Sequence, residues 1–120
     1  MSEEHPVLDA GAIERLEEWG GVALPRKMIG IFLEHSPERM DQVRDGLSGG
    51  DPSLAEAGAH SLKSSAGNVG AVQLQHLAEE AEVLAEEGRM EELRDLFPAM
   101  ESAFEAVCEA LRNTLEGMEE

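Results

Sequence analysis

The sequence predicts an all-α protein, an antiparallel four-helix bundle with an additional short N-terminal helix. Three observations support this fold class. Aromatic residues make up only 3% of the 120 residues and tyrosine is absent, a composition that favours helices over sheets. Apolar residues recur every three to four positions over long segments. Glycine-rich turns separate these segments, so their apolar faces are buried most simply in a bundle.

The first predicted helix is short and begins after Asp9, whose side chain can cap it. Its apolar positions recur near helical spacing: Ile13, Leu16 and Trp19. The glycines at 20–21 end it. We expect this helix to cover one end of the bundle. With 42% hydrophobic residues the chain suits one bundle domain, over residues 8–116, with tails at 1–7 and 117–120.

The second predicted helix begins near Pro25 and ends at the Ser-Gly-Gly sequence of residues 48–50. One side of this segment is apolar: Ile29, Leu33, Met40, Val43 and Leu47. Pro37 lies inside it, and an internal proline removes a backbone hydrogen bond and clashes with the preceding turn. Either the helix kinks at Pro37, or Ser36 caps a new segment.

The third predicted helix begins at Asp51-Pro52, an N-cap followed by proline in the first turn, and runs to about Gly67. Its inward positions fall within one narrow arc: Ala55, Ala59, Leu62, Ala66 and Val69. A second arc, roughly 120° away, carries the following residues: Glu56, His60, Lys63, Ser64 and Gly67. We therefore expect His60 to point outward, while the small inward residues let the helix pack closely on its neighbours.

The last two predicted helices follow the turn at 68–70 and the stop at Gly88. The first of them has these inward positions: Leu74, Leu77, Ala81 and Leu84. The second has apolar residues that alternate by three and four, as in the seam of a bundle: Leu93, Phe97, Met100, Phe104, Val107 and Leu111. Pro98 is expected to bend this helix near its start.

The chain is strongly acidic, with 26 acidic and nine basic residues and a formal net charge of −17. Nucleic acid and anionic membrane surfaces would be repelled, so we expect neither as a partner. Cys108 is the only cysteine, so no intramolecular disulfide can form, which fits a reducing cytoplasm. No segment approaches the ~20 apolar residues that span a bilayer. We expect a cytoplasmic monomer.

Sequence motifs for metal sites and for kinases are absent. His76 lies close to Glu79 and Glu80, but the Glu-x-x-His motif of di-iron helical bundles does not occur. There is also no phosphate-binding loop, glycine-rich nucleotide loop or kinase signature. We therefore expect no bound metal and no autonomous kinase activity.

The segment AHSLKSSAGNVGA, residues 59–71, surrounds His60 with small residues. Lys63 lies one helical turn from His60 on the same face, so its charge can act on an anionic group at the ring. Ser64 and Gly67 are small and leave the ring open on that side. Another macromolecule can therefore approach the outer ring nitrogen, with a positive charge beside it.

This segment resembles the motif of histidine-containing phosphotransfer (HPt) domains, H-x-L-K-G-[SA]-[SA]-x-x-x-G-A. Here the motif reads HSLKSSAGNVGA, from His60 to Ala71. The chain is similar to the family from about Leu8 to Leu115, and three further features share its pattern: Leu8-Asp9, Phe32 and Gly50-Asp51. Ser64 departs from it, because the family usually has glycine there. The added hydroxyl could slow docking or could hydrogen-bond a phosphoryl oxygen.

The resemblance implies that His60 carries a phosphoryl group on its outer nitrogen and that Lys63 stabilises the phosphoryl charge. It also implies that a Gln or Glu twenty-two residues after the histidine, here Glu82, orients the ring. From a turn near Val69, His60 lies ~14 Å along one helix and Glu82 ~20 Å along the next, and their side chains lean toward each other. Glu79, one turn earlier, is the alternative.

The resemblance implies a phosphocarrier that relays phosphoryl groups between aspartates of receiver domains in a His-Asp phosphorelay. We expect receivers to bind over Glu56, Ser64 and Gly67, and to supply Mg²⁺ from their own acidic pocket, with no cofactor bound by this chain. One alternative is a regulatory bundle that binds and sequesters a receiver or histidine kinase without carrying phosphate. Another is the histidine domain of a chemotaxis-type kinase, which would accept phosphate directly from an ATP-dependent kinase.

Overall fold

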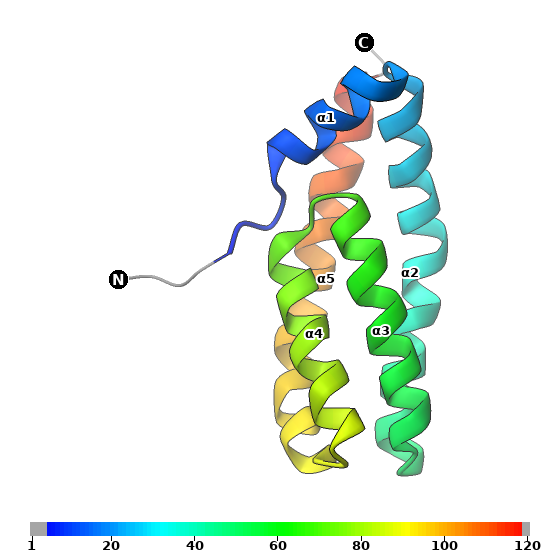
Figure 1. The fold of residues 1–120 in the computed structure, drawn as a ribbon, viewed down its shortest axis with the longest axis vertical. Coiled ribbons are helices and arrows are strands. Elements are labelled where there is room, and N and C mark those ends of the chain that lie inside the picture. Colours follow the sequence, from blue (N-terminus) through cyan, green and yellow to red (C-terminus); the bar gives the residue numbers. More distant parts are fainter. Residues whose placement is uncertain (1–4, 119–120) are drawn as a thin grey trace.

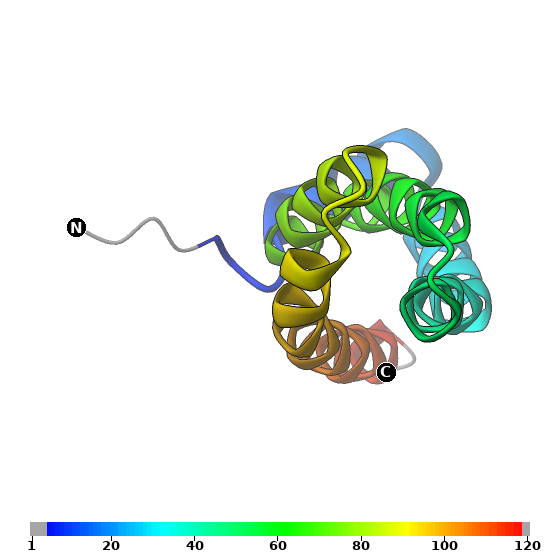
Figure 2. The ribbon, with the colours of Figure 1, turned by 90° about the horizontal axis from the view of Figure 1, so that it is seen from below.

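The computed structural model describes residues 5–118, and its regular structure over this range is entirely helical (Figure 1). The helices are α1 (Ala10–Gly20), α2 (Ala23–Gly49), α3 (Pro52–Asn68), α4 (Val72–Glu86) and α5 (Met90–Met118). Helices α2 to α5 form an antiparallel bundle, and α1 lies across the end that carries the α3–α4 turn (Figures 1 and 2). The predicted fold class is confirmed. Within residues 5–118, no helix combines the length and apolar character that a membrane span requires.

Capping residues fix where α1 and α3 begin. The carboxylate of Asp9 accepts a hydrogen bond from the Gly11 N–H at 3.0 Å, and that of Asp51 accepts one from the Leu54 N–H at 3.2 Å. Both N-caps were predicted from the sequence and both are confirmed, because each side chain satisfies a backbone donor that the first helical turn leaves unpaired. Helix α2 ends at Gly49, and the next residue, Gly50, is the C-cap, with a φ of 65° that favours glycine.

Helix α2 is continuous through Pro37, so the interpretation in which Ser36 caps a new segment is wrong. Ser36 is buried, and its hydroxyl donates back to the carbonyl oxygen of Phe32 instead of capping a following turn. Helix α5 likewise passes through Pro98 as one element. Tertiary packing along both helices outweighs the local cost of the prolines.

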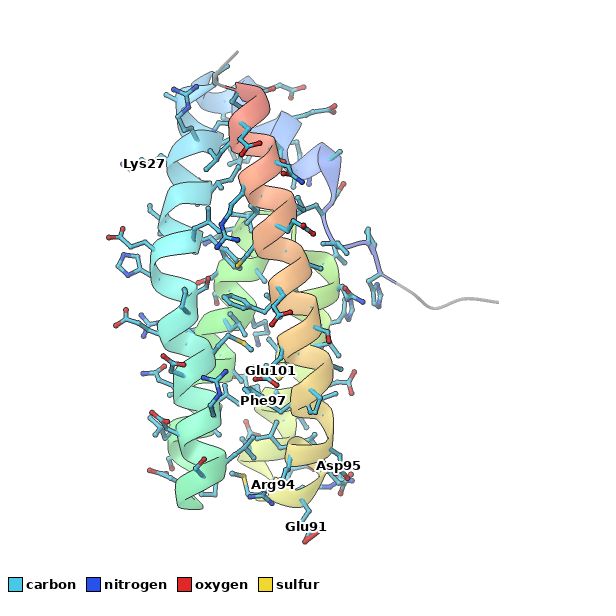
Figure 3. All side chains as sticks on the ribbon, turned by 180° about the vertical axis from the view of Figure 1, so that it is seen from behind. Lys27, Glu91, Arg94, Asp95, Phe97 and Glu101 are labelled. Carbon is cyan, nitrogen blue, oxygen red and sulfur yellow. The ribbon has the colours of Figure 1, made fainter. Side chains whose placement is uncertain are left out.

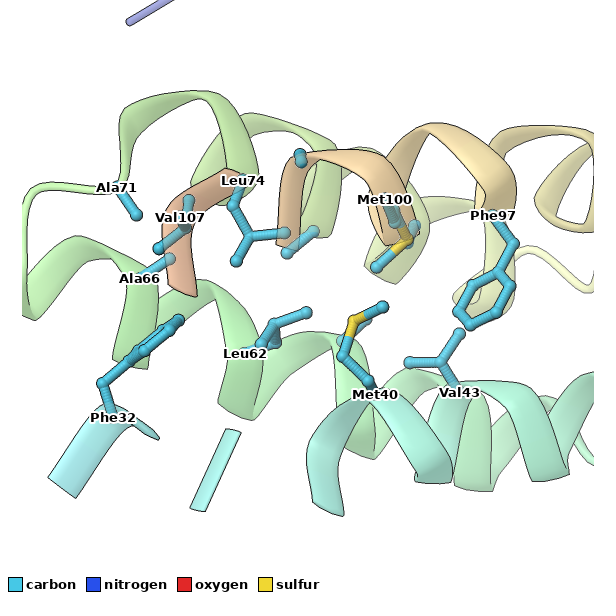
Figure 4. Close-up of a cluster of buried hydrophobic side chains, with 14 of the residues drawn as sticks. Phe32, Met40, Val43, Leu62, Ala66, Ala71, Leu74, Phe97, Met100 and Val107 are labelled. Carbon is cyan, nitrogen blue, oxygen red and sulfur yellow. The ribbon is translucent and has the colours of Figure 1, made fainter. Parts of the chain in front are cut away.

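The core lies between α2, α3, α4 and α5 (Figure 4). Figure 4 shows side chains from these helices meeting there, among them Phe32, Leu62, Leu74 and Met100. The inward arc predicted for α3 is fully buried. Four other positions expected to face inward are only half-buried: Leu33, Leu77, Leu84 and Phe104. They lie at the edges of the contacts between helices rather than at the centre.

Helix α1 covers one end of the bundle, as predicted, but its apolar positions are poorly buried, and Trp19 is 78% exposed. Helix α1 has no buried residue, and Ile13 and Leu16 are only half-buried. The reason is the placement of α1, which crosses the end of the bundle instead of packing along it (Figure 1). Its apolar face therefore has few partners, and the helix ends beyond the core.

Helix α3 packs closely on α2 because glycines lie where the two backbones meet. A Cβ atom at Gly46 would lie 2.7 Å from the backbone nitrogen of Ala55. A Cβ atom at Gly58 would lie 2.8 Å from the carbonyl oxygen of Arg39. These close approaches hold α3 against α2 close to His60, which follows Gly58 by two residues.

Candidate functional site

His60 lies on the outer side of α3, and α4 supplies the group that holds its ring. The His60 side chain is 61% exposed. Its Nδ1 atom lies 2.7 Å from Oε2 of Glu82, although the two residues are 22 apart in sequence. Within the described residues Nε2 makes no hydrogen bond. One ring nitrogen is therefore held by the protein, and the other is free to react or to bind a ligand.

Lys63 shares the carboxylate of Glu82 with His60. Its Nζ atom lies 2.7 Å from Oε1 of Glu82, while Oε2 contacts the ring. The Glu82 side chain is 16% exposed and that of Lys63 is 29% exposed, so both are more shielded than His60. The sequence predicted that Lys63 lies beside the imidazole, but not that it is paired with Glu82.

The charges of this cluster reinforce one another. The ion pair with Lys63 lowers the pKa of Glu82, partial burial opposes this, and the hydrogen bond from His60 lowers it further. The same pair raises the pKa of Lys63. Glu82 is therefore ionised at neutral pH and can accept a hydrogen bond from Nδ1–H of a neutral imidazole. In that tautomer the lone pair of Nε2 is free for attack on an electrophile.

Small residues leave the outer side of the ring uncovered. Ser64, one turn after His60, and Gly67 are exposed, and Glu56, one turn before His60, is half-buried. A Cβ atom at Gly67 would lie 2.9 Å from Nε2 of Gln75 on α4. Gln75 was missed by the sequence analysis, although it precedes Glu82 by seven residues and so lies on the same face of α4.

Glu79, the alternative partner for the ring, does not contact His60. It is exposed, and its charge contributes to raising the pKa of Lys63. The structure thus brings together His60, Lys63 and Glu82, and leaves Glu79 outside the cluster. Within the described part of the chain, no group of three or more His, Cys, Asp or Glu side chains is placed to hold a metal ion.

Comparisons with known proteins identify the family. The model of the Hpt domain family matches residues 27–117, which include the His60 cluster. The chain belongs to the Hpt domain family. The fold of this Hpt domain is similar to the crystal structure of histidine-containing phosphotransfer protein B (HptB) from Pseudomonas aeruginosa PAO1, with a TM-score of 0.86 and 27% sequence identity. The match covers 94% of this chain and 97% of that chain.

A comparison with curated proteins found no match. Membership of the family confirms the resemblance inferred from the motif around His60. Hpt domains are histidine phosphotransfer proteins of phosphorelays, and they are phosphocarriers rather than kinases. They typically interact with receiver domains. The chain therefore belongs to the class of histidine phosphotransfer proteins.

Proposed function

We propose that this Hpt domain relays a phosphoryl group between aspartates of receiver domains, with His60 as the phosphoacceptor. The contact between His60 Nδ1 and Glu82 carries the proposal. It leaves Nε2 as the nucleophilic nitrogen of a largely exposed ring, while the carboxylate fixes the ring orientation. Neither His35 nor His76 has a comparable carboxylate contact across two helices among the described residues.

In the proposed step, the Nε2 lone pair of His60 attacks the phosphorus of a receiver's aspartyl phosphate. The new N–P bond forms as the bond between phosphorus and the aspartate oxygen breaks, and the receiver regains its carboxylate. Nδ1 keeps its proton, so the ring becomes cationic, and the negative charge of Glu82 stabilises it. Transfer to the next receiver reverses these changes. Mg²⁺ held by the receiver would neutralise charge on the phosphoryl oxygens.

Two further roles belong to this proposal. Lys63 holds Glu82 ionised and places a cation one helical turn from the acceptor ring, where it offsets the charge of the phosphoryl group. Glu56, Ser64 and Gly67 contribute to the surface that a receiver covers when its aspartate reaches His60, because they flank the ring on the outer arc of α3.

The proposal is tested by mixing the purified protein with a receiver that carries a labelled aspartyl phosphate. We expect acid-labile label on the wild type and on a His35→Gln control, which changes an exposed histidine on α2. A His60→Gln variant should remain unlabelled. Equal labelling of His60→Gln would overturn the assignment. A stable complex of the wild type with the receiver, without any label, would instead support the sequestering bundle.

A further inference from the structure

A groove runs between α4 and α5, on a different face of α4 from Glu82. The two helices lie side by side in both ribbon views (Figures 1 and 2). The groove consists of a hollow of about 710 Å³ and a second of about 540 Å³, which share His76 and Glu80. Apolar side chains line the larger hollow: Val83, which is 46% exposed, and the half-buried Leu84 and Leu96.

Both sides of the larger hollow are acidic. Its carboxylates are Glu79 and Glu80 of α4 and Glu92 and Asp95 of α5. Among residues 5–118, only Glu92 of these four has an ion pair, with Arg89. Helix α4 contains no lysine or arginine. Like charges on two facing helices repel each other, so cations supplied from outside would stabilise this arrangement.

The contact between α5 and α2, on the other side of α5, contains a cation of the chain itself. There Arg44 of α2 forms ion pairs with Asp41 and Glu101, and its guanidinium lies 5.5 Å from the centre of the Phe97 ring. Figure 3 shows Phe97 and Glu101 on the side of α5 that faces α2, and Asp95 on the opposite side. The chain therefore neutralises carboxylates across α2 and α5 with its own cation, whereas among residues 5–118 Glu79, Glu80 and Asp95 of the α4–α5 groove form no ion pair.

We propose that the α4–α5 groove docks a basic amphipathic helix of a partner protein. The apolar side of that helix would cover Val83 and Leu96, and its lysines or arginines would pair with Glu80 and Asp95. The lining residues of α4 run from Gln73 to Leu84, a length of ~16 Å, which matches about three helical turns.

The N-terminal segment that contains His5 and Pro6 bounds the docking surface at the Gln73 end of α4. The ring of His5 stacks on that of His76 with 3.7 Å between centroids, and the Gln73 N–H donates to the carbonyl oxygen of Pro6 at 3.0 Å. His5 of this segment is itself part of the lining of the smaller hollow, so the larger one is the main contact. Because His60 does not line the groove, the docking does not rest on phosphotransfer.

The probe is an 18-residue peptide of leucine, lysine and alanine, with leucines on one helix face and lysines beside them. The control peptide has the same composition with leucines and lysines spread around the helix. We expect the amphipathic peptide to shift the backbone NMR signals of Glu80, Val83 and Leu96, and to bind more weakly as salt is raised. Equal binding of both peptides, or shifts confined to other surfaces, would overturn the proposal.

Charge reversal separates this groove from the overall acidity of the protein. Glu80→Lys with Asp95→Lys should weaken peptide binding at least about tenfold, measured by calorimetry. Glu38→Lys with Asp45→Lys changes the net charge equally on the exposed face of α2, and should weaken binding less than about twofold. Circular dichroism checks that both variants are folded. Equal weakening in the two variants would show that net charge, not the groove, attracts the peptide.

Discussion

Glu82 holds the inner ring nitrogen of His60 across two antiparallel helices, at 2.7 Å. Its other oxygen contacts Lys63 at the same distance. One carboxylate therefore sets the orientation of the ring and the position of the nearest cation. Changes at Glu82 should alter both the tautomer of His60 and its reactivity.

Removing this carboxylate should slow phosphotransfer. In Glu82→Ala, Nδ1 loses its acceptor and the ring is free to rotate, so we expect the transfer rate to fall about 10- to 100-fold. Glu82→Gln keeps an acceptor oxygen without the charge and should show a smaller loss. The rate is measured with a phosphorylated receiver under single-turnover conditions, and the tautomer of His60 by ¹⁵N NMR.

Glu79→Ala is the matched control, since Glu79 lies one turn away on α4 and does not contact the ring. Its transfer rate should stay within about twofold of the wild type. In Glu82→Ala the NMR signals of His60 should move from the Nδ1–H form toward a mixture of tautomers, and in Glu79→Ala they should not. A similar response of both variants would contradict the role given to Glu82.

The pair formed by Lys63 and Glu82 should make stability depend on pH. The pKa of Glu82 is lowered from 4.5, so its contribution is complete above pH 4.5 and is lost as the pH falls through the lowered value. The pKa of Lys63 is raised from 10.5, so its contribution is complete below pH 10.5 and is lost as the pH rises through the raised value. The pair therefore stabilises the fold mainly between these limits.

Lys63→Met removes the charge and keeps most of the aliphatic side chain. We expect this variant to lower the free energy of unfolding most at neutral pH, because both partners are charged in the wild type there. The difference from the wild type should shrink in strong acid and in strong base. Urea unfolding of both proteins across the pH range measures it. A difference that is constant with pH would show that the ion pair contributes nothing.

The sequence was informative where a local rule decides the structure. Asp9 and Asp51 are followed by helical segments, and each caps its helix as predicted. The resemblance to the family pointed to Glu82 as the partner of His60, and a count along two antiparallel helices joined by a tight turn agreed with it; the structure has this contact. The alanines of α3 showed which face is buried, because their spacing follows the helical period.

Features that depend on how helices are placed relative to one another could not be predicted. The apolar spacing of α1 includes Trp19, but periodicity does not show how much of that apolar face is buried when the helix lies across the end of a bundle. Local preference suggested a possible new helix at Ser36, and packing overrode it. The pairing of Lys63 with Glu82 depends on side-chain conformations in two helices, and sequence spacing alone does not determine these.

Ser64 replaces the glycine that is usual in the family, and its side chain is exposed one turn from His60. Ser64→Phe should slow transfer from a receiver about tenfold or more, because a bulky ring would obstruct the approach to Nε2. Ser64→Gly, the matched control, should transfer within about threefold of the wild-type rate. Ser64→Phe should keep the wild-type free energy of unfolding, and Ser64→Gly should lower it by only about 0.5 kcal/mol, because glycine is a poorer helix former than serine. Rapid transfer by Ser64→Phe would show that the receiver does not approach across this residue.

Two glycines of the α2–α3 pair should respond in opposite ways to substitution by alanine. At Gly58 the new Cβ would lie 2.8 Å from the Arg39 carbonyl oxygen, so Gly58→Ala must push the helices apart and should destabilise the protein by about 1–3 kcal/mol. Gly30 lies on the exposed face of α2 with nothing within 4 Å of such an atom. Gly30→Ala should therefore stabilise it by about 0.5–1 kcal/mol, because alanine favours helix.

Urea unfolding at neutral pH gives both values, and the transfer rate adds a second measurement. Because His60 follows Gly58 by two residues, a displaced α3 would move its ring relative to Glu82, so Gly58→Ala should also slow phosphotransfer. Gly30→Ala should leave the rate unchanged, since it alters no contact of α3. If Gly58→Ala were as stable and as fast as Gly30→Ala, close packing of α2 on α3 could not be what holds His60 against Glu82.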